Sequence, residues 1–151
     1  MILPLGYSLE YVLDIVAISS LYIYKWAYSS RYNPGPGAGK ESTLVGGGAG
    51  HGSAGGRGDT GSGGQSYGIT MLPVTLGSGG TTTGGGNGGG AIYIDCSGDI
   101  ILNGNIDASA NDGFPSSGAH GSGGSGGSVF LRAETLTGSA NILADGGDAI
   151  G

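Results

Sequence analysis

The clearest alternation of apolar and polar positions lies between residues 91 and 110. Apolar residues alternate or run together in three short blocks, Ala91–Cys96, Asp99–Asn103 and Asn105–Ala110. The pairs Ser97-Gly98 and Asn103-Gly104 punctuate these blocks, and such pairs are typical of tight turns. The pattern therefore predicts three short β-strands joined by turns.

This strand pattern returns later in the chain. The segment Gly89–Ile94 matches Gly126–Leu131 at a spacing of 37 residues, and Asn105–Ala108 matches Asn141–Ala144 at a spacing of 36 residues. A fixed period of this size marks solenoid proteins, in which each repeat buries its apolar face against the next. The sequence predicts an all-β fold, a parallel β-helix, with strand repeats in residues 91–151 and a glycine-rich excursion at residues 112–127. The side chains expected to point inward and to hold the repeats together are Ile92, Ile94, Ile101, Ile106, Val129, Leu131, Leu136 and Ile142.

Glycine dominates the chain before these strands, in residues 33–90. It supplies 38 of the 151 residues, and it recurs at every third position from Gly52 to Gly64 and from Gly118 to Gly127. Three residues per turn is the repeat of the polyproline II conformation, and glycine lets neighbouring backbones approach closely enough to bond. The pattern predicts polyglycine II-like segments, with a flexible linker as the alternative. The apolar block Tyr67–Leu76 favours order, because a linker has no need of it.

The first 32 residues have a different composition, with little glycine and an apolar, aromatic centre at Tyr11–Trp26. A signal peptide would begin with basic residues, but the first base is Lys25. A membrane-spanning helix would place the charge of Asp14 inside the bilayer. We therefore expect a strand or helix that packs on the rest of the chain; a membrane anchor and a segment foreign to the domain are the alternatives. The residues expected to form a subunit contact are Tyr11, Ile15, Leu21, Tyr22, Tyr24 and Trp26.

The charge and the cysteine content of the chain exclude some classes of function. Acidic residues outnumber Lys and Arg by 11 to 5, so the chain lacks the basic surface that nucleic-acid partners require. The single cysteine, Cys96, excludes an internal disulfide and a cysteine zinc site. A small buried strand residue is the preferred interpretation of this thiol. We expect no cofactor and no nucleic-acid partner.

Residues with catalytic or metal-binding chemistry are sparse. His51 and His120 lie in similar glycine-rich surroundings, and Asp145-Gly-Gly-Asp148 is the best fragment of a calcium site. Turn residues and solvated carboxylates are the favoured interpretations, so no metal site is predicted. A polysaccharide-cleaving enzyme would need carboxylates and bases along one long face, and Arg132 is the only Lys or Arg after Arg57. No catalytic residue is predicted.

The segment Ser97–Ala108 (SGDIILNGNIDA) resembles the repeats of filamentous-haemagglutinin-type adhesins. The surrounding order, with Leu76–Gly80, Gly89–Ile94 and Leu136–Ile142, is similar to the glycine-rich repeats of large cell-surface and extracellular proteins of protists, algae and bacteria. The resemblance implies right-handed parallel β-helices, a location outside the cell or at its surface, and a structural or adhesive role. It transfers no catalytic residue.

These observations predict an extracellular structural protein. It would be a self-associating subunit of a fibre or surface layer, assembled by stacking of β-solenoid coils and glycine-rich bundles. The alternative is an adhesive cell-surface module that binds glycans through exposed Tyr, Asn and Asp side chains. Ice binding is a third interpretation, for which only Thr81–Thr83 is suggestive.

Overall fold

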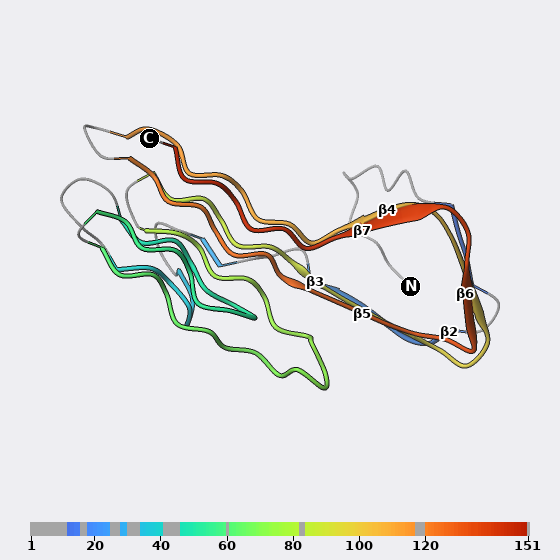
Figure 1. The fold of residues 1–151 in the computed structure, drawn as a ribbon. Helices are drawn as coiled ribbons and strands as arrows, with labels where there is room; N and C mark the ends of the chain where they lie inside the picture. The colour runs from blue at the N-terminus through green and yellow to red at the C-terminus, as the bar shows by residue number, and fades with distance from the viewer. Residues whose placement is uncertain are drawn as a thin grey trace.

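The computed structural model describes residues 12–15, 18–24, 28–29, 34–40, 46–59, 61–81, 84–116 and 120–150. These residues form β-strands and no helix, so none of them lies in a helix that could cross a membrane. The strands shown in Figure 1 are β1 (Val12–Ile15), β2 (Ile18–Tyr24), β3 (Ala91–Cys96), β4 (Asp99–Asp107), β5 (Ser128–Arg132), β6 (Thr135–Thr137) and β7 (Ala140–Leu143).

The strands form two small sheets. One has the order β1-β4-β6, with β7 also paired to β4, and the other has the order β2-β3-β5. Strands β5, β6 and β7 pair in parallel with β3 and β4, whereas β1 and β2 pair antiparallel with β4 and β3. In Figure 1, β7 accordingly follows β4, and β5 follows β3. The two strands from the N-terminal segment thus lie on the opposite side of β3 and β4 from the later strands.

The parallel register has the same offset as the sequence repeat. Ala91 lies opposite Ser128, 37 residues later, and Asp99 lies opposite Thr135, 36 residues later. The offset of 36 continues through the pair of β4 and β7, which begins at Gly104 and Ala140. Equivalent positions of the two repeats therefore lie side by side.

The core is small and lies on one face of the first repeat. Strand β4 alternates strictly, with even-numbered apolar residues buried and odd-numbered residues exposed, as expected of a half-buried strand. Gly104 interrupts it with a φ of 134°, which favours glycine, at the point where its partner changes from β6 to β7. The buried cluster is Ile94, Cys96, Ile100, Leu102 and Ile106, with Ile92, Val129, Leu131 and Ala133 packed around it.

The predicted fold class, a parallel β-helix, is wrong. The described residues form two small sheets, and these close into neither a barrel nor a solenoid. Two causes are visible. The chain has only two copies of the strand repeat, and strands from outside the repeat pair antiparallel with the first copy.

The glycine-rich residues lie beside one another without forming strands, as the undulating traces in Figure 1 show. Residues 121–128 illustrate how they pack, because successive residues contact three different neighbours. Gly121 and Gly127 lie against the backbone of residues 84–90, and Gly123 and Gly126 lie against residues 144–147. Ser125, on the third side, accepts a hydrogen bond from the Ser78 N–H at 2.8 Å. The three-residue spacing of glycine thus leaves room for close backbone neighbours.

Candidate functional site: an open strand edge

The most distinctive feature of the strand region is an edge formed by β5, β6 and β7. Within the described part of the chain, each of these strands is paired on one side only, with β3 or β4. The other side of each strand presents backbone N–H and C=O groups without a strand partner. Such an edge is a template for pairing with another chain.

Apolar side chains along this edge are exposed although their equivalents in the first repeat are buried. Ile100 is 0% exposed, but Leu136, its partner in the register, is 50% exposed. Ile106 is 7% exposed, but its partner Ile142 is 46% exposed. The side chains have the same character in both repeats, so the difference arises because no further strand among the described residues covers the second repeat.

A row of polar contacts also links the two repeats. The Asn141 Nδ2 group donates to Asn105 Oδ1 at 3.0 Å, and the Asp148 N–H donates to Asp112 Oδ1 at 2.7 Å. The Asp145 N–H likewise donates to Ser109 Oγ at 3.1 Å. Side-chain oxygens of the first repeat thus accept hydrogen bonds from N–H groups of the second repeat. Among the described residues, Asn141 Oδ1 and the side-chain oxygens of Asp148 accept no corresponding bond.

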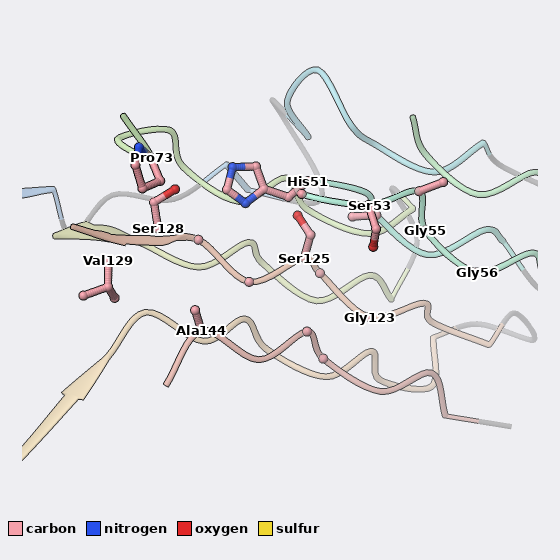
Figure 2. A pocket seen from close by; sticks show the side chains of 18 residues that line it. His51, Ser53, Gly55, Gly56, Pro73, Gly123, Ser125, Ser128, Val129 and Ala144 are labelled. Atoms are coloured by element: carbon pink, nitrogen blue, oxygen red, sulfur yellow. The ribbon is translucent and has the colours of Figure 1, made fainter. Parts of the chain in front are cut away.

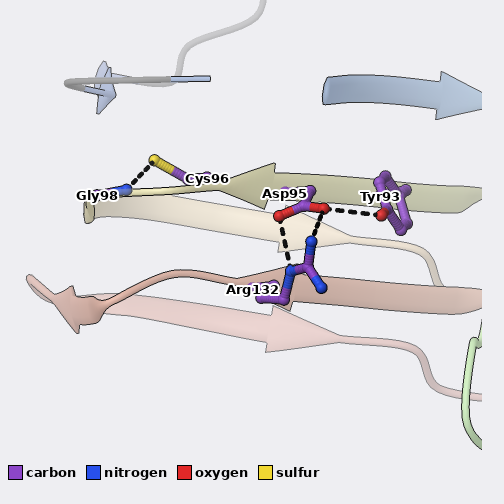
Figure 3. A network of polar contacts seen from close by, with 5 residues as sticks. All are labelled: Tyr93, Asp95, Cys96, Gly98 and Arg132. Atoms are coloured by element: carbon purple, nitrogen blue, oxygen red, sulfur yellow. Dashed lines mark hydrogen bonds and ion pairs between the residues drawn. The ribbon is translucent and has the colours of Figure 1, made fainter. Parts of the chain in front are cut away.

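Aromatic and charged side chains lie on the outer face of β3 and β5. The rings of Tyr93 and Phe130 are stacked, with centroids 4.8 Å apart and an interplanar angle of 6°. Figure 3 shows Arg132 held by both carboxylate oxygens of Asp95, with Nε 2.8 Å from Oδ1, while the Tyr93 hydroxyl donates to Oδ2. Hydrogen bonding from Arg132 is the main cause that lowers the pKa of Asp95. The carboxylate therefore stays ionised and fixes the guanidinium at the edge.

Some of the residues predicted to point inward are buried in the structure, and others are exposed. Ile94 and Ile106 lie in the core, with Ile92, Val129 and Leu131 packed against it. Ile101 was predicted wrongly, since it is 38% exposed and its neighbour Ile100 points inward. Leu136 and Ile142 are also not buried, because they lie at the open edge. Ile100 and Leu102 were not predicted as inward residues, although both share the even-numbered positions of Ile106 in β4.

The predicted subunit-contact residues lie mainly in the two N-terminal strands. Ile15 belongs to β1, and Leu21, Tyr22 and Tyr24 belong to β2. Both strands pair with β4 and β3 of the same chain. Tyr11 and Trp26 lie outside the described residues. One edge of each N-terminal strand is therefore already occupied within the chain.

A hollow of about 580 Å³ lies between the glycine-rich segments (Figure 2). Most of the residues that line it are glycine or alanine, and its polar side chains are His51, Ser53, Ser125 and Ser128. The imidazole Nε2 lies 2.6 Å from the Thr75 hydroxyl oxygen, and the ring packs against Tyr67 with centroids 4.8 Å apart. The His51 contacts connect residues 49–53 with residues 67–76.

The His51 environment predicts a pH dependence of stability. Burial lowers the pKa of His51, and hydrogen bonds with the backbone of Gly126 and Gly127 only partly oppose this. As the pH falls below about 6.5, the unfolded chain therefore binds a proton that the folded chain resists. We expect the urea concentration at the unfolding midpoint to decrease as the pH is lowered from about 7.5 to about 5.5. The substitution His51→Gln should remove most of this decrease. The exposed His120, changed to Gln, is the matched control, and an equal effect of both substitutions would contradict the assignment.

The candidate metal ligands are not brought together. No group of three or more His, Cys, Asp or Glu side chains in the described part of the chain could hold a metal ion. His120 is exposed, and Asp145 and Asp148 use their backbone N–H groups in the contacts between the repeats. These aspartates thus take part in pairing of the repeats.

Comparison with known proteins finds no matching family model, no similar curated protein and no similar solved structure.

Proposed function

We propose that this chain is a structural subunit of an extracellular fibre or surface layer, which grows by addition of strands at the edge of β5, β6 and β7. The observation that carries the proposal is the contrast between buried Ile100 and Ile106 and their exposed register partners Leu136 and Ile142. Covering these side chains would remove apolar area from water, which drives association. The extracellular location is supported by the resemblance of Ser97–Ala108 to adhesin repeats.

The proposal is tested by a substitution that introduces a charge at the open edge. Leu136→Lys places an ammonium group in the short strand β6, where an added strand would have to bury it. Burying an unpaired charge costs more than about 1.4 kcal/mol of binding free energy. The concentration at which the variant assembles should therefore rise by about tenfold or more. Electron microscopy and sedimentation of the full chain measure this directly.

Met71→Lys is the matched control. Met71 is 89% exposed and lies outside the strands, so the substitution adds the same charge and removes a similar apolar side chain elsewhere. We expect this variant to assemble like the unmodified chain, and circular dichroism to show that both variants are folded. Equal loss of assembly in both variants would contradict a specific role of the edge.

Glycan binding is the second candidate function, and the outer face of β3 and β5 favours it. Tyr93 and Phe130 offer aromatic surface, and the Arg132 side chain, which is 67% exposed, offers N–H groups that can donate to sugar hydroxyls (Figure 3). An unmodified chain that stays monomeric at its highest soluble concentration would count against the structural proposal. Loss of glycan-array binding on Arg132→Ala, with the fold retained, would then support the second candidate.

A further inference from the structure

The two sides of the first repeat are covered by different kinds of strand. On one side, β5, β6 and β7 continue the repeat in parallel, at the offset of 36 or 37 residues. On the other side, β1 and β2 pair antiparallel, and their sequences have no counterpart in the repeat. The N-terminal strands therefore occupy the position that an earlier repeat would take.

The open edge of β5, β6 and β7 is complementary to the side of β3 and β4 that β1 and β2 cover. If β3 and β4 of a second copy followed β5, β6 and β7 in parallel, the offset between the two repeats would simply continue. The second copy's Asn105 amide could then donate to Asn141 Oδ1, as Asn141 donates to Asn105 within the chain. Its Asp112 N–H could donate to the carboxylate of Asp148, as the Asp148 N–H donates to Asp112. Both acceptors are unused within the described residues.

Apolar side chains would also repeat their existing neighbours. Ile100 of the added copy would lie next to Leu136, and Ile106 would lie next to Ile142, just as each pair is adjacent within the chain. A second copy docked on the outer edges of β1 and β2 would meet antiparallel strands instead, and these lack the equivalent positions. The contact between the repeats within the chain is thus the template for the contact between copies.

We propose that β1 and β2 form a displaceable cap, and that a second copy of this chain docks its β5–β6–β7 edge on β3 and β4 when the cap leaves. The inference rests on the proposed structural function. It adds that the partner of the open edge is a second copy of this chain, and that the cap controls when the copies assemble. An isolated chain keeps the cap in place by strand pairing within the chain. When the cap leaves, strand pairing within the chain is replaced by strand addition from a second copy.

A disulfide that locks the cap tests this inference in the full chain. Ile18 in β2 lies opposite Cys96 in β3, the only cysteine of the protein, next to a register shift between Ile18 and Ser20. Directly opposite residues in antiparallel strands have Cα atoms about 4.5–5.5 Å apart, within the range that a disulfide accepts. Ile18→Cys should therefore form a disulfide with Cys96 on oxidation with diamide, detectable by mass and by loss of free thiol.

We expect the reduced Ile18→Cys chain to assemble like the unmodified chain and the oxidised chain to stay monomeric, with recovery after reduction. The control is Ile18→Ala, treated with the same oxidant, which should assemble throughout. If the disulfide fails to form, Tyr24→Cys with Ala91→Cys, in a Cys96→Ser background, locks another opposite pair of β2 and β3.

Three results would overturn the inference in distinguishable ways. Assembly of the oxidised chain as readily as the reduced one would show that the cap need not leave. Loss of assembly in Ile18→Ala would show that β2 is itself part of the contact between copies. Failure of the unmodified chain to assemble would refute the proposed function, and with it this inference.

Discussion

Replacement of Ile100 by alanine is expected to destabilise the folded chain by about 3 kcal/mol, because it removes a fully buried side chain from a small core. Ile100 is 0% exposed and belongs to a cluster with Ile94, Cys96, Leu102 and Ile106. The neighbours of Ile100 are held by strand pairing, so they cannot move far to fill the space. Urea unfolding followed by circular dichroism measures the change.

Ile101→Ala is the matched control, since it makes the same chemical change one residue later on the other face of β4. Ile101 is 38% exposed, so its loss should cost less than about 1 kcal/mol. Similar costs for the two substitutions would mean that β4 does not have the observed register. A larger cost for Ile101→Ala would show that Ile101 points inward, as its sequence pattern predicted.

The strand repeat could be predicted from the sequence because parallel pairing places equivalent residues side by side. The spacing of 37 and 36 residues is visible in the sequence and returns as the register of β3 with β5 and of β4 with β6 and β7. The face of β4 was harder to predict, because Ile100, Ile101 and Leu102 are consecutive apolar residues. A shift of one residue exchanges the two faces of a strand. The polar residues Asp99, Asn103 and Asn105 do identify the exposed face, since they share odd-numbered positions.

The N-terminal strands and the open edge could not be predicted in the same way. Strand β2 pairs with β3 about seventy residues later in the chain, and antiparallel pairing between unlike sequences leaves no repeat to detect. Exposure of Leu136 and Ile142 depends on whether another strand follows them in space. Their own sequence resembles that of a buried strand, so its pattern predicts burial.

The glycine-rich residues lead to the second prediction with a large effect, because many glycines there have another backbone where a side chain would begin. A Cβ atom added to Gly127 would lie 1.7 Å from the carbonyl oxygen of Gly90. The Gly127 N–H also donates to the Ala108 carbonyl oxygen at 2.9 Å. The backbone of residue 127 is thus held between two neighbouring segments and has no direction in which to move.

Gly127→Ala is therefore expected to destabilise the chain by more than about 3 kcal/mol, because the obstructing atom is backbone and cannot turn away as a side chain could. The damage should extend to the strands, since residue 127 directly precedes β5 and the Ser128 N–H donates to the Gly90 carbonyl oxygen. Hydrogen exchange on residues 84–90 and 128–132, together with urea unfolding, would locate the effect.

Gly56→Ala separates this steric cause from the general effect of replacing glycine. A Cβ atom at Gly56 meets nothing within 4 Å, and the φ angle there is outside the left-handed region. Alanine at this site should be neutral or should stabilise the fold by about 0.4–1 kcal/mol, since it restricts the unfolded chain. If Gly127→Ala were as mild as Gly56→Ala, the close backbone packing of the glycine-rich segments would be refuted. A severe effect confined to Gly127→Ala would show that glycine is required there to bring neighbouring backbones into contact.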